Sequence, residues 1–202
     1  MSQQQVLIGD IIFISLIIIF ILYKRKTVNK GKGVKNGDIY ILCINKLKAK
    51  IKRPKGLYIP DQKIINRVEN NFYDEMALTA LADDILKHCG FRPASLFVSV
   101  VDYDPDDHTA GQYQIRGNQS SIQIQQLPNM DMDEVLAVLI HECMHFFLHC
   151  RGLTMPTTQE NEYLTDITGV YMGFGEYMRK GYGRVGYLSK GDLIYVKSII
   201  NN

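Results

Sequence analysis

The chain has 202 residues, of which 46% are hydrophobic and 22% charged, and its formal net charge is +2. This is the composition of an ordinary globular chain that can build a core, and it argues against a fibrous or largely disordered protein. The four cysteines, at positions 43, 89, 143 and 150, have neither C-x-x-C nor disulfide-framework spacing. We therefore expect reduced thiols in a cytosolic domain.

An apolar segment near the N-terminus predicts a membrane helix. Residues 6–23 are strongly apolar from Ile11 onward and are followed by Lys24, Arg25 and Lys26. As a helix they span about 27 Å, close to the hydrocarbon thickness of about 30 Å. Because the positive charges follow the segment, we expect a single-pass protein of the cell membrane, with its N-terminus outside and its catalytic domain cytoplasmic. A buried helix of a soluble domain is the alternative.

A basic segment follows the predicted anchor. Residues 24–55 contain twelve lysine and arginine residues and one acid, Asp38. We interpret residues 24–56 as a juxtamembrane linker that contacts anionic lipid head groups, and a merely solvated segment is the alternative. Within it, residues 38–44 and 47–53 have the pattern of short strands. Nucleic-acid binding is not expected, because no aromatic residues are interleaved with the lysines.

The remaining residues, 57–202, are expected to form the folded domain. Apolar residues at helical spacing predict one amphipathic helix over residues 64–88, and residues 95–103 have the pattern of a strand. Two alternating runs, 111–115 and 121–125, predict a β-hairpin. Helices are expected to follow the hairpin, so the fold class is α+β.

The strongest chemical signal is an H-E-x-x-H motif from His141 to His145. Asp131 and Glu134 have the spacing of a capping box, which predicts the start of the helix that contains the motif. On a helix the two imidazoles share one face, which suits two ligands of a tetrahedral zinc ion. Glu142 can take a proton from a metal-bound water as that water attacks a carbonyl. The alternative is a core helix whose polar groups find hydrogen bonds.

A second predicted helix, residues 159–172, offers a third ligand. Glu162 and Asp166 lie one turn apart on one of its faces. A catalytic zinc site needs three protein ligands and one open position, so Glu162 is the candidate third ligand. Asp166 would accept the other N–H of a ligand histidine and fix its tautomer. His149 is the alternative ligand, although eight residues beyond His141 it is rotated about 80° around the helix.

Residues on either side of these two helices are candidates for substrate binding. We interpret the second run of the hairpin as an exposed edge strand that could pair with an extended peptide substrate, and an ordinary edge strand is the alternative. Its residues are Ser121, Ile122, Gln123, Ile124 and Gln125. The candidates for stabilising an oxyanion are Tyr171 and Tyr187, with Tyr177 and Tyr182 as further tyrosines in the same part of the chain.

The H-E-x-x-H motif followed by E-x-x-x-D on a second helix resembles the gluzincin family of zinc metallopeptidases. The resemblance covers residues 111–179, and the run from His145 to His149 is also similar to compact metallopeptidases of the ImmA/IrrE type. It implies a minimal zincin fold, in which a small antiparallel or mixed sheet lies over an active-site helix and a second, glutamate-bearing helix.

The same resemblance implies one Zn²⁺ per chain, Glu142 as general base and hydrolysis of peptide or protein substrates. No oxyanion-stabilising residue of the family is recognised, so a catalytically inactive metallopeptidase-like module that binds zinc or a partner is the alternative. A deformylase-type amide hydrolase would use a cysteine ligand, which Cys89 does not supply in the required motif.

Overall fold

The computed structural model describes residues 36–93, 95–106, 109–116, 119–183 and 186–201. The chain divides into two compact units, of which one comprises residues 34–103 and 109–202. The other comprises residues 1–33 with 104–108. It is described only at residues 104–106, where the Asp106 N–H donates to Asp104 Oδ1 at 2.9 Å.

The larger unit is α+β, as the sequence predicts. Its elements in chain order are α2 (Gly37–Lys50), α3 (Gln62–Asn70), α4 (Glu75–His88), β1 (Leu96–Val101), β2 (Gly111–Arg116), β3 (Gln119–Gln125), α5 (Met132–Cys150), α6 (Thr158–Tyr171), α7 (Gly175–Gly181) and α8 (Lys190–Asn201).

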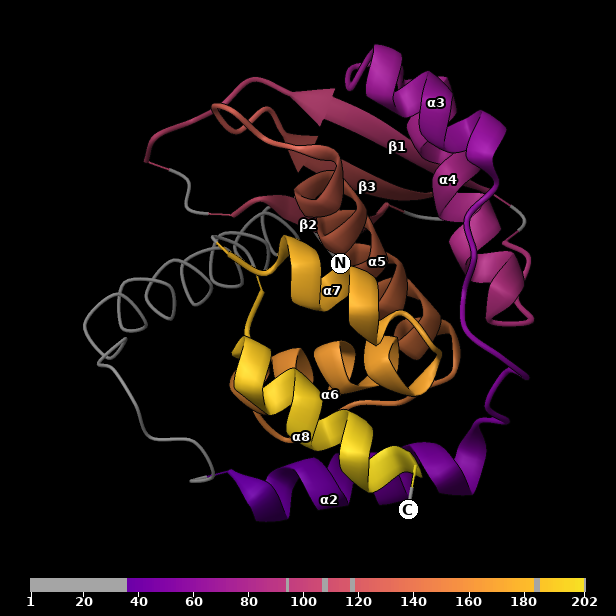
Figure 1. Ribbon diagram of the computed structural model, residues 1–202, viewed down its shortest axis with the longest axis vertical. Coiled ribbons are helices and arrows are strands. Elements are labelled where there is room, and N and C mark those ends of the chain that lie inside the picture. Colours follow the sequence, from indigo (N-terminus) through magenta and orange to yellow (C-terminus); the bar gives the residue numbers. More distant parts are fainter. Residues whose placement is uncertain (1–35, 94, 107–108, 117–118, 184–185, 202) are drawn as a thin grey trace, which may run out of the picture. The chain divides into compact units, whose positions relative to one another are not determined.

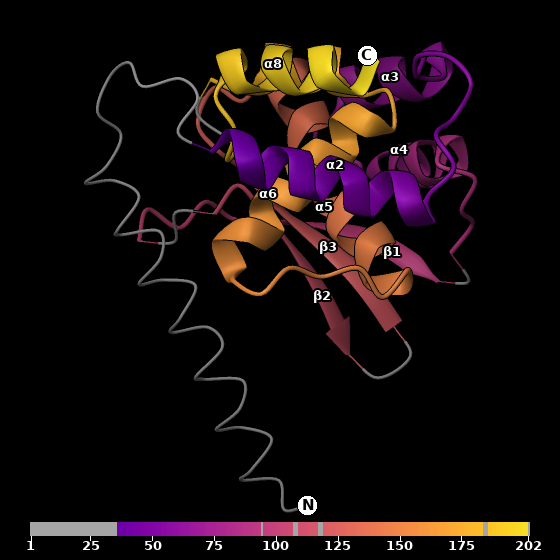
Figure 2. The same ribbon diagram turned by 90° about the horizontal axis from the view of Figure 1, so that it is seen from below.

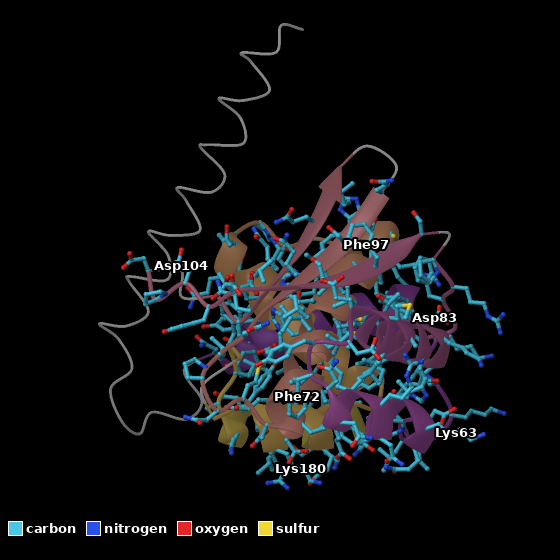
Figure 3. The ribbon with its side chains drawn as sticks, turned by 90° about the horizontal axis from the view of Figure 1, so that it is seen from above. Lys63, Phe72, Asp83, Phe97, Asp104 and Lys180 are labelled. Carbon is cyan, nitrogen blue, oxygen red and sulfur yellow. The ribbon has the colours of Figure 1, made fainter. Side chains whose placement is uncertain are left out.

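The three strands form a mixed sheet in the order β1-β3-β2. β3 is antiparallel to β2, which confirms the predicted hairpin, and parallel to β1. Ile122 and Ile124 of β3 are buried in the core, whereas Gln123 lies on the opposite face and accepts a hydrogen bond from Gln114 at 2.8 Å. Phe97 of β1 is exposed on the surface (Figure 3).

The position of β3 corrects the interpretation of residues 121–125 as an edge strand. Ser121, Ile122, Gln123 and Ile124 pair with β1 on one side and with β2 on the other. Gln125 pairs with β1 and donates its N–H to the carbonyl of Ala110, just before β2. Their alternation of apolar and polar residues reports a sheet with two different faces but says nothing about its edges. Among the described strands, the edge strand beside α5 is β2.

Helix α5 is the centre of the unit. Thirteen of its nineteen residues are buried, so it is enclosed on most sides instead of presenting one face to the core. It contacts β2 and β3 on one side and α4, α6 and α7 on others. In Figure 1 it runs obliquely from the strands toward the lower right, with α7 and α6 on one side of it and α4 on the other. Cys143 is fully buried and its Sγ lies 3.9 Å from the carbonyl oxygen of Ala82, so this side chain packs in the core.

Helix α2 replaces the two strands predicted over residues 38–44 and 47–53. Tyr40, Cys43, Ile44 and Leu47 are buried, and their spacing of three and four residues puts them on one helical face. That face packs on α6 and α8, beside which α2 lies in Figure 2. The helical spacing of the buried residues therefore decided the structure over the local strand-like alternation. As a result, the part of the expected linker (residues 24–56) from α2 onward belongs to the folded unit.

The single helix predicted over residues 64–88 is two helices, α3 and α4. The break lies at residues 71–74, where the Asp74 carboxylate accepts the N–H of Ala77 and caps α4. Phe72, labelled in Figure 3, lies in this turn and packs against the core. Its apolar side chain continued the helical pattern in the sequence, although α3 ends at its C-cap Asn71 and a new helix begins at the N-cap Asp74.

No helix in the described residues is long and apolar enough to cross a membrane. The span predicted over residues 6–23 lies outside the described residues. The described residues therefore give no support to the expected transmembrane helix or to the expected single-pass localisation. The corrected fold is an α+β unit with a small mixed sheet and helices.

Candidate metal site

The two histidines of the motif are positioned by a helix with a firm start. The Asp131 carboxylate accepts the N–H of Glu134 at 2.8 Å, and the Glu134 carboxylate accepts the N–H of Asp131 at 3.2 Å. This capping box confirms the predicted start of α5. One turn apart in the second half of the helix, His141 and His145 bring their rings to a centroid separation of 4.7 Å.

Helix α6 is fixed in a similar way at its start. Thr157 and Glu160 form a second capping box, and Asn161 binds the preceding loop through its side-chain amide. Asn161 Oδ1 accepts the N–H of Met155 at 2.7 Å, and its Nδ2 donates to the Met155 carbonyl at 2.9 Å. Glu162, the next residue, therefore projects from a well-anchored first turn toward α5.

Three ligand atoms from α5 and α6 converge on one point. His141 Nε2 and His145 Nε2 are 3.0 Å apart, and Glu162 Oε2 lies 3.2 Å from the first and 3.1 Å from the second. Hydrogen bonds along all three edges of this triangle would need three protons. Each of the two Nε2 atoms carries at most one proton and the ionised carboxylate carries none, so hydrogen bonds alone cannot satisfy all three atoms. A single cation contacting all three atoms satisfies them together, so this group could hold a metal ion.

Both histidines are oriented with the nitrogen lone pair facing this point. His141 Nδ1 donates to Asp166 Oδ1 at 2.7 Å, which leaves Nε2 as the acceptor in the neutral ring. His145 Nδ1 lies 3.2 Å from Thr165 Oγ1, whose own proton goes to the Asn161 carbonyl at 2.9 Å. The Thr165 oxygen therefore accepts from His145, and both Nε2 atoms are available as metal ligands.

The electrostatics of the cluster favour a positive charge at its centre. Burial raises the pKa of Glu162, but the two histidines outweigh it and hold that pKa far below its ordinary value. Burial works to lower the pKa of His141, but Asp166 and Glu162 outweigh it and raise that pKa well above its ordinary value. Without a metal, the negative charges of Asp166 and Glu162 therefore favour a proton on His141. A bound cation would compensate the same two charges.

Glu142 lies beneath the edge strand β2. A Cβ at Gly111 would lie 3.1 Å from Glu142 Cγ and 2.7 Å from Val138 Cγ1, so the strand approaches α5 as closely as glycine allows. The backbone N–H of Tyr113 donates to the Glu142 carboxylate. Burial raises the pKa of Glu142, which His141 and His145 partly offset. A buried carboxyl beside the metal cluster is suited to taking up and releasing a proton.

Asp166 connects the cluster to the C-terminal part of the chain. It is fully buried and accepts four hydrogen bonds. Besides that from His141, they come from the Tyr182 hydroxyl at 2.5 Å and the backbone N–H groups of Tyr187 and Leu188 at 3.0 and 2.7 Å. Burial and Asp166 raise the pKa of Tyr182 well above its ordinary value, so its hydroxyl stays protonated as a donor.

The other predicted site residues lie in different surroundings. Tyr171, a candidate for oxyanion stabilisation, is buried and donates to the Ile51 carbonyl at 3.0 Å, on the α2 side of α6. Tyr187 stacks on the His141 ring, with centroids 5.3 Å apart and an interplanar angle of 20°. His149, the alternative ligand, is exposed and lies against the Tyr113 ring.

Two supporting residues were not predicted. Thr165, the acceptor for His145, precedes Asp166 by one residue, and no spacing rule marks it. Tyr182 was only one of four tyrosines considered for another role, and its contact with Asp166 depends on how the chain folds back after α7. Neither residue type carries a metal-site signal of its own in the sequence.

Comparison with known proteins returned no match: no family model fits the sequence, and neither a curated protein nor a solved structure matches it significantly. The resemblance to gluzincins therefore rests on the motif residues. The three-atom cluster of His141, His145 and Glu162 is a geometric observation independent of that resemblance.

Proposed function

We propose that this chain is a zinc-dependent metallopeptidase that hydrolyses peptide bonds in peptide or protein substrates. His141, His145 and Glu162 hold the zinc, and Glu142 is the general base. The observation that carries the proposal is the triangle of ligand atoms with edges of 3.0–3.2 Å, with Glu142 next to the first ligand on the same helix.

The ligand set supports zinc over other common cations. In a tetrahedral site with metal–ligand distances of about 2.0 Å, ligand atoms are about 3.3 Å apart, close to the edges of this triangle. Two imidazole nitrogens and one carboxylate suit zinc, whereas magnesium and calcium prefer oxygen ligands. Three protein ligands also leave a fourth position open, as catalytic zinc sites require.

The exposure of the ligands supports access by a substrate. The side chain of His145 is 25% exposed, against 13% for Glu162 and 8% for His141. Solvent and substrate therefore reach the cluster from the side of His145, while the side of His141 is closed.

The edge strand β2 supports binding of an extended peptide. The Gln125 N–H of β3 donates to the Ala110 carbonyl, and bonded and non-bonded pairs alternate along antiparallel strands. The N–H and C=O groups of Gly111, Tyr113 and Ile115 therefore point away from β3, to an edge with which no described strand pairs. A substrate backbone bound along this edge would pass over Glu142, which already accepts from Tyr113.

Proton transfer would depend on Glu142. A zinc ion bound at the cluster supplies Lewis acidity, which polarises the scissile carbonyl and makes water a stronger acid. Glu142 takes the proton of the attacking water and passes it to the leaving amine. The Nδ1–H groups of His141 and His145 would stay hydrogen-bonded to Asp166 and Thr165 throughout, so that the Nε2 atoms face the metal.

The test is the variant Glu142→Gln, assayed on a broad peptide library with and without chelator. We expect it to bind zinc as the wild type does and to lose hydrolysis by at least about a hundredfold, the lower contribution expected of a general base. Asp133→Asn, an exposed carboxyl in the first turn of α5, is the control and should retain activity.

Two results would count against this function. Retained hydrolysis by Glu142→Gln would exclude Glu142 as the base. Zinc binding by the wild type without any chelator-sensitive cleavage would instead indicate a metallopeptidase-like module that binds metal without catalysis.

A further inference from the structure

We infer that Tyr182 is a positioning residue for the metal ligand His141, and that docking of the C-terminal segment, of which residues 182–183 and 186–188 are described, onto α6 raises the affinity of the site for its metal. The inference rests on the metal site of the proposed function but not on peptide hydrolysis. It concerns a segment twenty residues and more beyond the last ligand, Glu162.

The first observation is how completely this segment fixes Asp166. Oδ1 of Asp166 accepts from both His141 Nδ1 and the Tyr182 hydroxyl, at 2.7 and 2.5 Å. Oδ2 accepts the backbone N–H groups of Tyr187 and Leu188. Three of the four donors thus belong to the segment, and α6 contributes only the carboxylate itself. Rotation of that carboxylate, which would release His141, requires several of these bonds to break together.

The second observation is that the segment also touches His141 directly. The Tyr187 ring lies nearly parallel to the imidazole, with centroids 5.3 Å apart. The Tyr182 hydroxyl is 3.5 Å from His141 Nδ1. The face of this ligand ring is therefore covered by Tyr187, and at its edge the Tyr182 hydroxyl shares the acceptor Asp166 Oδ1 with Nδ1.

The third observation is a close contact between Gly186 and the Tyr182 ring. Gly186 has φ +95°, and a Cβ there would lie 2.3 Å from Cδ2 of the Tyr182 ring. Only glycine is compatible with this contact and this backbone conformation. The Tyr182 ring therefore packs against the residue that directly precedes the two N–H groups bound by Asp166.

Together these contacts couple metal binding to the C-terminal segment. A ligand that is held in its bound orientation loses less freedom when the metal arrives, so a docked segment strengthens binding. Partners of metal-bound histidines contribute about ten- to a hundredfold in metal affinity. Because Tyr182 acts through Asp166, we expect its hydroxyl to contribute about tenfold, at the lower end of that range.

The test is the zinc affinity of the full chain carrying Tyr182→Phe, measured by competition with a chromophoric chelator. The variant keeps the aromatic ring against Gly186 and removes only the hydroxyl. We expect its affinity for Zn²⁺ to fall about tenfold. The visible absorption of the Co²⁺-loaded protein should also change, because a reoriented imidazole alters the ligand field.

Tyr171→Phe is a matched control. Tyr171 and Tyr182 are each 5% exposed, and each donates one hydrogen bond through its hydroxyl. Tyr171 donates to the Ile51 carbonyl and has no link to the metal ligands, so Tyr171→Phe should bind zinc as the wild type does.

The outcomes separate this inference from the proposed function. If the wild type binds zinc and Tyr182→Phe binds it equally tightly, the segment does not position His141 and the inference is wrong. An equal loss in Tyr171→Phe would show a general effect of losing a buried hydroxyl, and it too would overturn the inference. If the wild type binds no zinc, the metal site itself is wrong, and the inference falls with it.

Discussion

The two histidine ligands of the candidate site share one helix but have different surroundings. His141 is nearly enclosed, bonds to the carboxylate Asp166 and is covered by the Tyr187 ring. His145 is more exposed, and its Nδ1 bonds to the neutral hydroxyl of Thr165. The difference teaches that the cluster has a rigid, closed side built by the C-terminal segment and an open side, from which a substrate would approach under the proposed function.

The largest effect is expected where the two histidines share a partner. Glu162 contacts both Nε2 atoms, so Glu162→Ala should abolish stoichiometric zinc binding, as measured by metal analysis of the dialysed protein. Glu160→Gln, which changes a neighbouring carboxyl but can preserve the capping box, should bind zinc normally. Unchanged occupancy in Glu162→Ala would show that Glu162 is not the third ligand.

Removing the charge behind His141 should have the next largest effect. We expect Asp166→Asn to lower zinc affinity about a hundredfold, because an amide is a weaker acceptor for Nδ1 and also disturbs the bonds to Tyr182 and Leu188. A chelator competition titration measures it. If Asp166→Asn lowered zinc affinity no more than Thr165→Val, the corresponding change at the partner of His145, the distinction between a rigid and an open side would be wrong.

That corresponding change is Thr165→Val, which has nearly the same shape but no hydroxyl. It leaves His145 Nδ1 without its acceptor, and we expect zinc affinity to fall about tenfold, because the lost partner is neutral. The same competition titration reports it. An unchanged affinity would indicate that His145 is oriented by packing alone.

The smallest effect should come from a change that leaves both histidines alone. Asp131→Ala breaks the capping box of α5, ten residues before His141, and should destabilise the protein by about 1 kcal/mol, or about 3 °C in Tm. Its zinc affinity should equal that of the wild type. Thermal unfolding of the metal-free protein measures the first quantity, and a fall in affinity would mean that helix stability, not ligand orientation, limits binding.

The sequence predicted the two site helices because their signals are local. The H-E-x-x-H spacing, the capping box at Asp131 and the i,i+4 pair of Glu162 and Asp166 all depend on residues within a few turns of one another. These patterns predict which side chains share a helix face. That the faces of α5 and α6 meet, at 3.0–3.2 Å between ligand atoms, is a finding of the structure.

The sequence did not predict the closed side of the site, because that side depends on contacts between distant residues. Tyr182 reaches Asp166 only because the chain turns back after α7, and Thr165 acts only because α6 packs on α5. The edge strand was misassigned for the same reason: the parallel pairing of β1 with β3 is long-range, and alternation within β3 does not reveal it. In α2, the packing against α6 and α8 selected a helix where the local pattern also fitted strands.

The most direct test of the site is X-ray absorption at the zinc edge of the full chain loaded with one equivalent of Zn²⁺. Coordination by His141, His145 and Glu162 predicts a shell of nitrogen and oxygen at about 2.0–2.1 Å, including two imidazoles and no sulfur. Because the chain has four cysteines, a sulfur shell at about 2.3 Å is the clear opposing result. Such a shell, or no stoichiometric binding, would contradict this account.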